Sequence, residues 1–145
     1  MNINSIGGCQ ALSQWSDYGA SKFALRGLTQ ALRFEFDEQL PNLVMTNIYP
    51  YYINTGMFKG FQPLAEKLIP TIDQHTASNR IYNAIMYEES EVYMYWFLYY
   101  VDTLMRCLPL VVSQLLYKHL FAKGMKSFEG RKEQLAGLEA AKKTK

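Results

Sequence analysis

Cysteine and histidine, the residues that most often build metal sites and disulfides, are scarce in this sequence. Its 145 residues include two cysteines and two histidines. Cys9 and Cys107 lie far apart in apolar surroundings, so the sequence predicts no disulfide framework and suits a reducing compartment. His75 and His119 have no acidic or thiolate partners at ligand spacing, so we expect no metal site.

Charge of either sign is also limited. Charged residues make up 19% of the chain, hydrophobic residues make up 49%, and the formal net charge is +2. So apolar a chain is expected to fold rather than stay disordered, and so small a net charge argues against a nucleic-acid partner. Basic residues gather only in residues 131–145, which we interpret as a solvated charged tail. Contact of this tail with anionic lipid headgroups is the alternative.

Strand and helix patterns alternate along the chain and predict an α/β fold. Residues 3–6, 44–49 and 91–96 are typical of strands, and residues 17–39 and 76–87 are typical of helices. Strands joined by crossover helices pair in parallel, so we expect a parallel sheet.

The first predicted helix carries an apolar face and one glycine. The spacing predicts one apolar face of small to medium side chains, and we expect Gly27 to sit where another backbone approaches closely. The face consists of Ala20, Ala24, Leu28, Ala31 and Leu32.

Residues 92–121 form the most apolar stretch. Asp102, Arg106 and Pro109 interrupt it, leaving charge-free pieces much shorter than the roughly 20 residues that a spanning helix needs. A helical hairpin, or an apolar surface that lies on a membrane, fits this pattern better.

Tyr18 and Lys22 are four residues apart at the start of the first helix, so their side chains lie on one face. A phenol has a pKa of about 10, and a neighbouring ammonium is able to lower it by roughly 1–3 units. Such a tyrosine is able to act as a general acid and base in alcohol oxidation or carbonyl reduction. Ser5, between a strand and the turn Gly7-Gly8, is placed to bind the substrate oxygen.

Three motifs in order resemble the short-chain dehydrogenase/reductase superfamily. They are Ser5, the run Tyr18-Gly19-Ala20-Ser21-Lys22-Phe23-Ala24, and Pro50-x-x-Ile53-x-Thr55. The resemblance implies that Tyr18 is the catalytic acid/base, that Lys22 lowers its pKa and binds the nicotinamide ribose, and that Ser5 holds the substrate oxygen.

For the third motif, the resemblance implies a place in the cofactor site. Ile53 would offer its backbone to the nicotinamide carboxamide of NAD or NADP, next to Pro50, and Thr55 would fix that end of the cofactor. Tyr51 stands where the family usually has glycine after this proline, so we expect an altered loop conformation there.

The run from Pro50 to Gly60 resembles epidermal-type retinol dehydrogenases and lipid-droplet 17-beta-hydroxysteroid dehydrogenases. This resemblance implies an apolar alcohol or ketone as substrate, such as a retinoid, a steroid or another lipid. It also implies a place on the cytosolic face of the endoplasmic reticulum or of lipid droplets, with a cytoplasmic location as the alternative, and a possible homodimer of the parent enzyme. Tyr51, Met57 and Phe58 are the predicted substrate-binding residues.

The Gly-rich strand–turn–helix that binds pyrophosphate is missing. We therefore expect the C-terminal half of a Rossmann-type doubly wound parallel sheet, with the first half absent. By itself, this C-terminal half is expected to bind neither NADH nor NADPH. The expected parts are a partial catalytic domain (1–96), an apolar helical extension (97–130) and the charged tail (131–145). The alternatives are a non-catalytic truncated product with a membrane-associated or regulatory role, and an apolar-ligand binding domain with an accidental Tyr/Lys pair.

Overall fold

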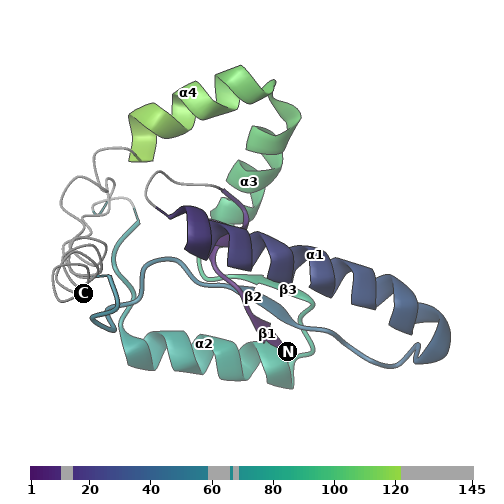
Figure 1. The fold of residues 1–145 in the computed structure, drawn as a ribbon. Coiled ribbons are helices and arrows are strands. Elements are labelled where there is room, and N and C mark those ends of the chain that lie inside the picture. Colours follow the sequence, from purple (N-terminus) through teal and green to yellow (C-terminus); the bar gives the residue numbers. More distant parts are fainter. Residues whose placement is uncertain (11–14, 59–65, 67–68, 122–145) are drawn as a thin grey trace, which may run out of the picture.

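A parallel sheet of three strands lies at the centre of the computed structural model (Figure 1). The strands follow the order β1 (Asn2–Ile3), β2 (Asn47–Tyr49) and β3 (Glu91–Tyr93), and both pairings are parallel. The structure describes residues 1–10, 15–58, 66 and 69–121. The α/β class and the parallel sheet predicted from the sequence are confirmed, and the arrangement is consistent with a partial Rossmann-like fold.

The helices follow the strands in the expected alternation. A short 3-10 helix, η1 (Ile6–Gly8), is followed by α1 (Ser16–Gln39) between β1 and β2. Next, α2 (Gln74–Met86) connects β2 to β3, and its first turn is capped by Asp73, whose carboxylate accepts the Thr76 amide hydrogen at 2.9 Å. The helices α3 (Phe97–Cys107) and α4 (Leu110–Phe121) come after the sheet.

The sheet separates two apolar clusters. Ile48 and Val92 are fully buried on one face, where they pack with Ala84 of α2. The other face carries Tyr49 and Tyr93, whose rings stack with centroids 4.6 Å apart in a cluster with Cys9, Ile69 and Leu98. Because α1 and α2 lie on opposite sides of the strands, the fold is layered as helix, sheet and helix (Figure 1).

Polar side chains attach α1 to the rest of the chain. Lys22 donates to the Ile3 carbonyl at 3.0 Å, and Asn2 donates to the Thr29 hydroxyl at 2.9 Å. Near the end of the helix, Arg33 bonds the Met45 and Ser90 carbonyls and pairs with Glu91. With Arg26, described below, these positions recur every three or four residues and form one stripe that faces the sheet.

The predicted apolar face of α1 lies away from the sheet in the described structure. Four of its five members are exposed and Leu32 is half-buried. The polar stripe occupies the side of the helix that meets the sheet, so the apolar face points outward. The expectation for Gly27 is wrong, because a side chain there would meet nothing within 4 Å among the described residues.

A glycine does allow a close backbone approach, but at Gly8. A Cβ atom at Gly8 would lie 2.9 Å from the Lys22 carbonyl oxygen of α1 and 2.3 Å from Asn4 Oδ1. Only a residue without a side chain lets η1 lie this close to the turn of α1 that contains Lys22.

The C-terminal apolar stretch forms two helices, α3 and α4, separated at Leu108-Pro109, and their packing as a hairpin stays a prediction. No helix within the described residues has the length and hydropathy to cross a membrane. Residues 122–145, which include the predicted charged tail, lie outside the described residues, and the proposed division at residue 96 stays a prediction.

Substitution of the two glycines is expected to change stability in opposite directions. Gly27→Ala should raise the free energy of unfolding by about 1 kcal/mol, because alanine favours the helix and meets no neighbour. Gly8→Ala should lower it by about 1–3 kcal/mol, because the new methyl group overlaps the Lys22 carbonyl. Urea unfolding followed by circular dichroism measures both, and a Gly8→Ala protein as stable as the wild type would contradict the close approach.

Candidate functional site

Ser5 lies directly after β1 and begins η1. Its backbone is extended, and its hydroxyl oxygen accepts a hydrogen bond from the Gly7 amide at 3.0 Å. The residue is 8% exposed. The hydroxyl is thus fixed by the turn that follows it, at the carboxyl end of a parallel strand, where open α/β sheets bind their ligands.

Tyr18 lies beside Ser5 across Gly7. A Cβ atom placed on Gly7 would be 3.1 Å from Tyr18 Cε1 and 3.5 Å from the Ser5 hydroxyl oxygen. A side chain at position 7 would therefore crowd both the serine hydroxyl and the phenol ring. The structure therefore brings together the two residues that the sequence analysis assigned to one substrate oxygen.

The Tyr18 ring is enclosed by two other aromatic rings. Trp15 meets it edge-on at a centroid distance of 5.4 Å and Phe58 at 5.8 Å, and Trp15 and Phe58 stack on each other at 5.0 Å. Such edge-to-face contacts fix a ring in one orientation. Trp15 went unnoticed in the sequence analysis, although its position three residues before Tyr18, at the start of a helix, puts it within reach of that ring.

Lys22 is one turn beyond Tyr18 on the same face of α1. Its Nζ lies 5.7 Å from the Tyr18 ring centroid and donates to the Ile3 carbonyl. The ammonium group therefore lies between the end of β1 and the phenol ring. An ammonium has three N–H donors, and the hydrogen bond to the Ile3 carbonyl uses one of them.

The pKa of the Tyr18 phenol is raised above its ordinary value, chiefly by burial, while a hydrogen bond from Ser5 lowers it. The expected lowering by Lys22 is not among the causes. The Lys22 ammonium group donates to the Ile3 carbonyl and lies over the ring, 5.7 Å from its centroid. In the described structure, Tyr18 is thus a protonated phenol near neutral pH.

The predicted cofactor-binding run follows β2. Pro50 is buried, Ile53 pairs with Ile72 in a parallel bridge, and the Thr55 amide donates to the Ile53 carbonyl at 2.8 Å. Thr55 itself is exposed. Since β1 and β2 are parallel neighbours, this run and Ser5 lie at the same edge of the sheet.

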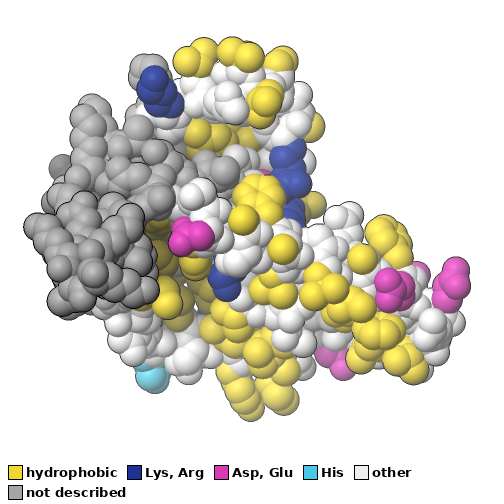
Figure 2. Space-filling view, in the orientation of Figure 1, with side chains coloured by type: hydrophobic (Ala, Val, Ile, Leu, Met, Phe, Trp, Pro, Cys, Tyr) yellow, Lys and Arg dark blue, Asp and Glu magenta, His cyan; other side chains and the backbone are white. Residues whose placement is uncertain are grey.

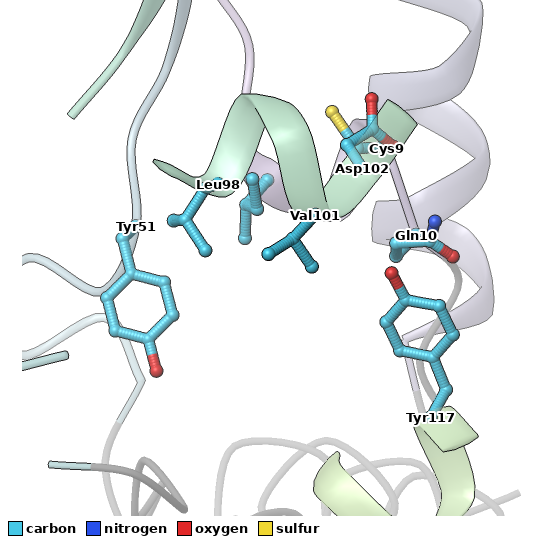
Figure 3. Close-up of a pocket in the computed structure, with 8 residues that line it drawn as sticks. Cys9, Gln10, Tyr51, Leu98, Val101, Asp102 and Tyr117 are labelled. Carbon is cyan, nitrogen blue, oxygen red and sulfur yellow. The ribbon is translucent and has the colours of Figure 1, made fainter. Parts of the chain in front are cut away.

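The three predicted substrate-binding residues have different surroundings. Phe58 packs on Tyr18, whereas Met57 is 70% exposed. Tyr51 lines a largely apolar pocket beside α3 (Figure 3). The other residues that line this pocket are Ile6, Cys9, Gln10, Leu98, Val101, Asp102 and Tyr117.

Comparison with known proteins finds a similarity to one family. Residues 1–64 match the family model for short chain dehydrogenase. All of the residues discussed above from Ser5 to Phe58 lie within that match. The match relates the chain to the short-chain dehydrogenases.

Curated relatives extend the similarity toward the C-terminus. Epidermal retinol dehydrogenase 2 of Mus musculus is 32% identical over 134 residues, which is 91% of this chain and 43% of that protein. The Homo sapiens protein of the same name is 31% identical over 92% of this chain and 44% of its own length. Short-chain dehydrogenase/reductase family 16C member 6 of Bos taurus is 39% identical over 60% of this chain and 28% of its length. The chain therefore spans less than half the length of these relatives.

Two substitutions are expected to move the pKa of Tyr18 in opposite directions. Phe58→Ala should lower it toward the ordinary phenol value, because water then reaches a ring whose burial raises it. Ser5→Ala should raise it further, because the hydrogen bond that favours the phenolate is lost. Titration of the Tyr18 ¹³Cζ resonance, assigned by its loss in Tyr18→Phe, measures both changes.

Phe34, which is 71% exposed on α1 far from this ring, supplies the control. Phe34→Ala should leave the titration of Tyr18 unchanged. A shift in the same direction for Phe58→Ala and Ser5→Ala would contradict the two assigned causes.

Proposed function

We propose that these residues form the catalytic part of an NAD(P)-dependent oxidoreductase that interconverts an apolar alcohol and its carbonyl compound. The observation that carries this proposal is the placement of the Ser5 hydroxyl and the Tyr18 phenol on either side of Gly7, with Lys22 one turn away. The relation to short-chain dehydrogenases supports it.

The residues present fit the chemistry of a nicotinamide dinucleotide. Lys22 offers ammonium N–H donors of the kind that bind sugar hydroxyls, and Pro50, Ile53 and Thr55 lie at the same sheet edge. When bound, NADH or NADPH would supply the hydride for carbonyl reduction. Tyr18, Lys22 and the run 50–55 are therefore the proposed cofactor-binding residues.

For carbonyl reduction, Tyr18 donates its proton to the substrate oxygen while the Ser5 hydroxyl holds that oxygen. The raised pKa of Tyr18 keeps the proton available near neutral pH. In the opposite direction, the tyrosinate takes the hydroxyl proton of the alcohol. One positioned acid/base of this type contributes typically about 10²–10⁴-fold to a rate.

The apolar character of the substrate is proposed from the side chains around the site. Trp15 and Phe58 enclose Tyr18, and Tyr51 lines the pocket with Leu98 and Val101. Pockets with apolar walls and few polar groups bind apolar ligands. The names of the relatives, which specify retinol, favour a lipid alcohol as the first substrate to test.

Tyr18→Phe should reduce turnover by at least about 10²-fold while leaving cofactor affinity nearly unchanged, because only the proton donor is lost. The assay uses a chimera in which this chain replaces the matching residues of mouse epidermal retinol dehydrogenase 2. Formation or loss of NAD(P)H absorbance is followed with retinol, a steroid alcohol and ethanol as substrates.

Tyr82→Phe removes a phenol that is 61% exposed on α2 and should leave turnover unchanged. Equal turnover by the Tyr18→Phe and wild-type chimeras would refute the assigned role. A preference for ethanol over the apolar alcohols would refute the substrate class.

We also propose that the outer surface of α3 and α4 lies on a membrane. Trp96 and Tyr100 are 75% and 63% exposed, and Leu104, Leu110 and Val111 are 60–70% exposed. Figure 2 shows hydrophobic side chains along α4. Tryptophan and tyrosine favour the membrane interface, and the exposed cations Arg106 and Lys118 complement anionic headgroups.

Replacement of apolar residues on this surface should weaken membrane binding. Leu110→Asp/Val111→Asp should lower the fraction that floats with vesicles containing phosphatidylserine by about tenfold or more, because charges are costly at an apolar interface. Met86→Asp, a matched change at an exposed residue of α2, should float like the wild type. A wild-type chain that stays unbound would contradict the proposal.

A further inference from the structure

Asp102 is a buried carboxylate on α3 with three partners. It is 4% exposed, and its Oδ2 accepts hydrogen bonds from Arg26 Nη1 at 3.0 Å and from the Tyr93 hydroxyl at 3.3 Å. Its Oδ1 accepts from Arg106 Nε at 3.0 Å. A buried charge requires such partners, so Asp102 fixes the position of every group that it binds.

One of these groups belongs to the helix that carries the proposed catalytic residues. Arg26 is one turn beyond Lys22 and two turns beyond Tyr18 on α1, so the three side chains lie on the same face. The Arg26 guanidinium also lies 5.3 Å from the ring centroid of the buried Tyr49. Its position is therefore set both by the sheet and by α3.

The other side of Asp102 leads to the segment that carries Ser5. The Tyr93 hydroxyl, which donates to Asp102, lies 3.6 Å from the thiol sulfur of Cys9. Cys9 caps the end of η1, and Ser5 caps its beginning. Figure 3 shows Cys9 and Asp102 together at one wall of the pocket.

We propose that Asp102 and Arg26 form a positioning pair through which α3 holds α1, and with it Tyr18 and Lys22, in place beside Ser5. Neither residue touches the reacting atoms. A role of the pair in catalysis rests on the proposed function. The structural coupling of α3 to Tyr18 does not depend on that function. Both readouts below are therefore independent of turnover.

The first readout is the ¹³Cζ resonance of Tyr18 in residues 1–145. Arg26→Met removes the charge and keeps an apolar side chain on Tyr49. We expect it to shift the Tyr18 resonance, because α1 loses its link to α3. Arg106→Met removes a second cation from the same carboxylate but lies on α3 itself, so it should leave the Tyr18 resonance in place.

The second readout is the alkylation rate of Cys9 in a Cys107→Ser background. Cys9 is 3% exposed, and burial raises the pKa of its thiol to about 11, so the native thiol reacts slowly. Arg26→Met should accelerate alkylation by about 10²-fold, because the buried Asp102 loses the cation at its Oδ2 and the link between α3 and α1 is lost. Glu89→Gln breaks the more exposed Arg80–Glu89 pair, 34% and 36% exposed, and should not change the rate.

The double variant Arg26→Met/Asp102→Leu is the control that separates loss of the pair from unfolding of the protein. It removes both buried charges and so avoids an unpaired carboxylate. A positioning pair predicts that the Tyr18 resonance stays shifted although the protein remains folded. A wild-type Tyr18 resonance in this variant, or an equal shift in Arg106→Met, would overturn the proposal.

Turnover of the chimera then separates this proposal from the proposed function. If the pair positions the catalytic residues, Arg26→Met should lower kcat more than it changes KM for the alcohol. A chimera without activity would refute the proposed function and leave the NMR and alkylation results to decide the coupling.

Discussion

The attachment of α1 to the sheet by polar side chains is the interaction on which the candidate site depends. Lys22, Arg26, Thr29 and Arg33 face the strands at intervals of three or four residues. Hydrogen bonds specify direction and distance, whereas apolar contacts tolerate sliding. A helix held in this way presents Tyr18 in a fixed position along its axis. The same stripe explains why its apolar residues point outward.

The approach of η1 to α1 complements this attachment. Gly8 lets the turn after Ser5 reach the backbone of Lys22, and Gly7 lets the Ser5 hydroxyl and the Tyr18 ring lie on either side of one α-carbon. The two glycines thus act through their lack of a side chain rather than through flexibility. The close approach of the η1 and α1 backbones sets the distance between Ser5 and Tyr18. The polar stripe sets the orientation of α1, and with it the side from which Tyr18 faces Ser5.

The local parts of this arrangement could be predicted from the sequence, and the long-range parts could not. Strand and helix periodicity predicted the parallel sheet, and the spacing of Tyr18 and Lys22 placed them on one face. The orientation of α1 could not be predicted, because periodicity shows that two faces differ but not which one meets the sheet. The partner of Arg26 is 76 residues away at Asp102, and no local pattern encodes such a pairing. The pKa of Tyr18 likewise depends on burial of the ring and on the hydrogen bond from Ser5, which only the folded chain defines.

The buried carboxylate of Asp102 defines how α3 packs against the rest of the chain. The residues of α3 that are buried are Leu98 and Asp102, one turn apart. An apolar contact at Leu98 supplies attraction without a preferred register, whereas Asp102 satisfies its partners in one arrangement only, since each oxygen has its own donor. Burial of charge generally costs stability and in some proteins contributes specificity. For the proposed positioning pair, the specificity is the register between α3 and α1. A membrane surface that binds the outer side of α3 would therefore act on the same helix that Arg26 ties to Tyr18.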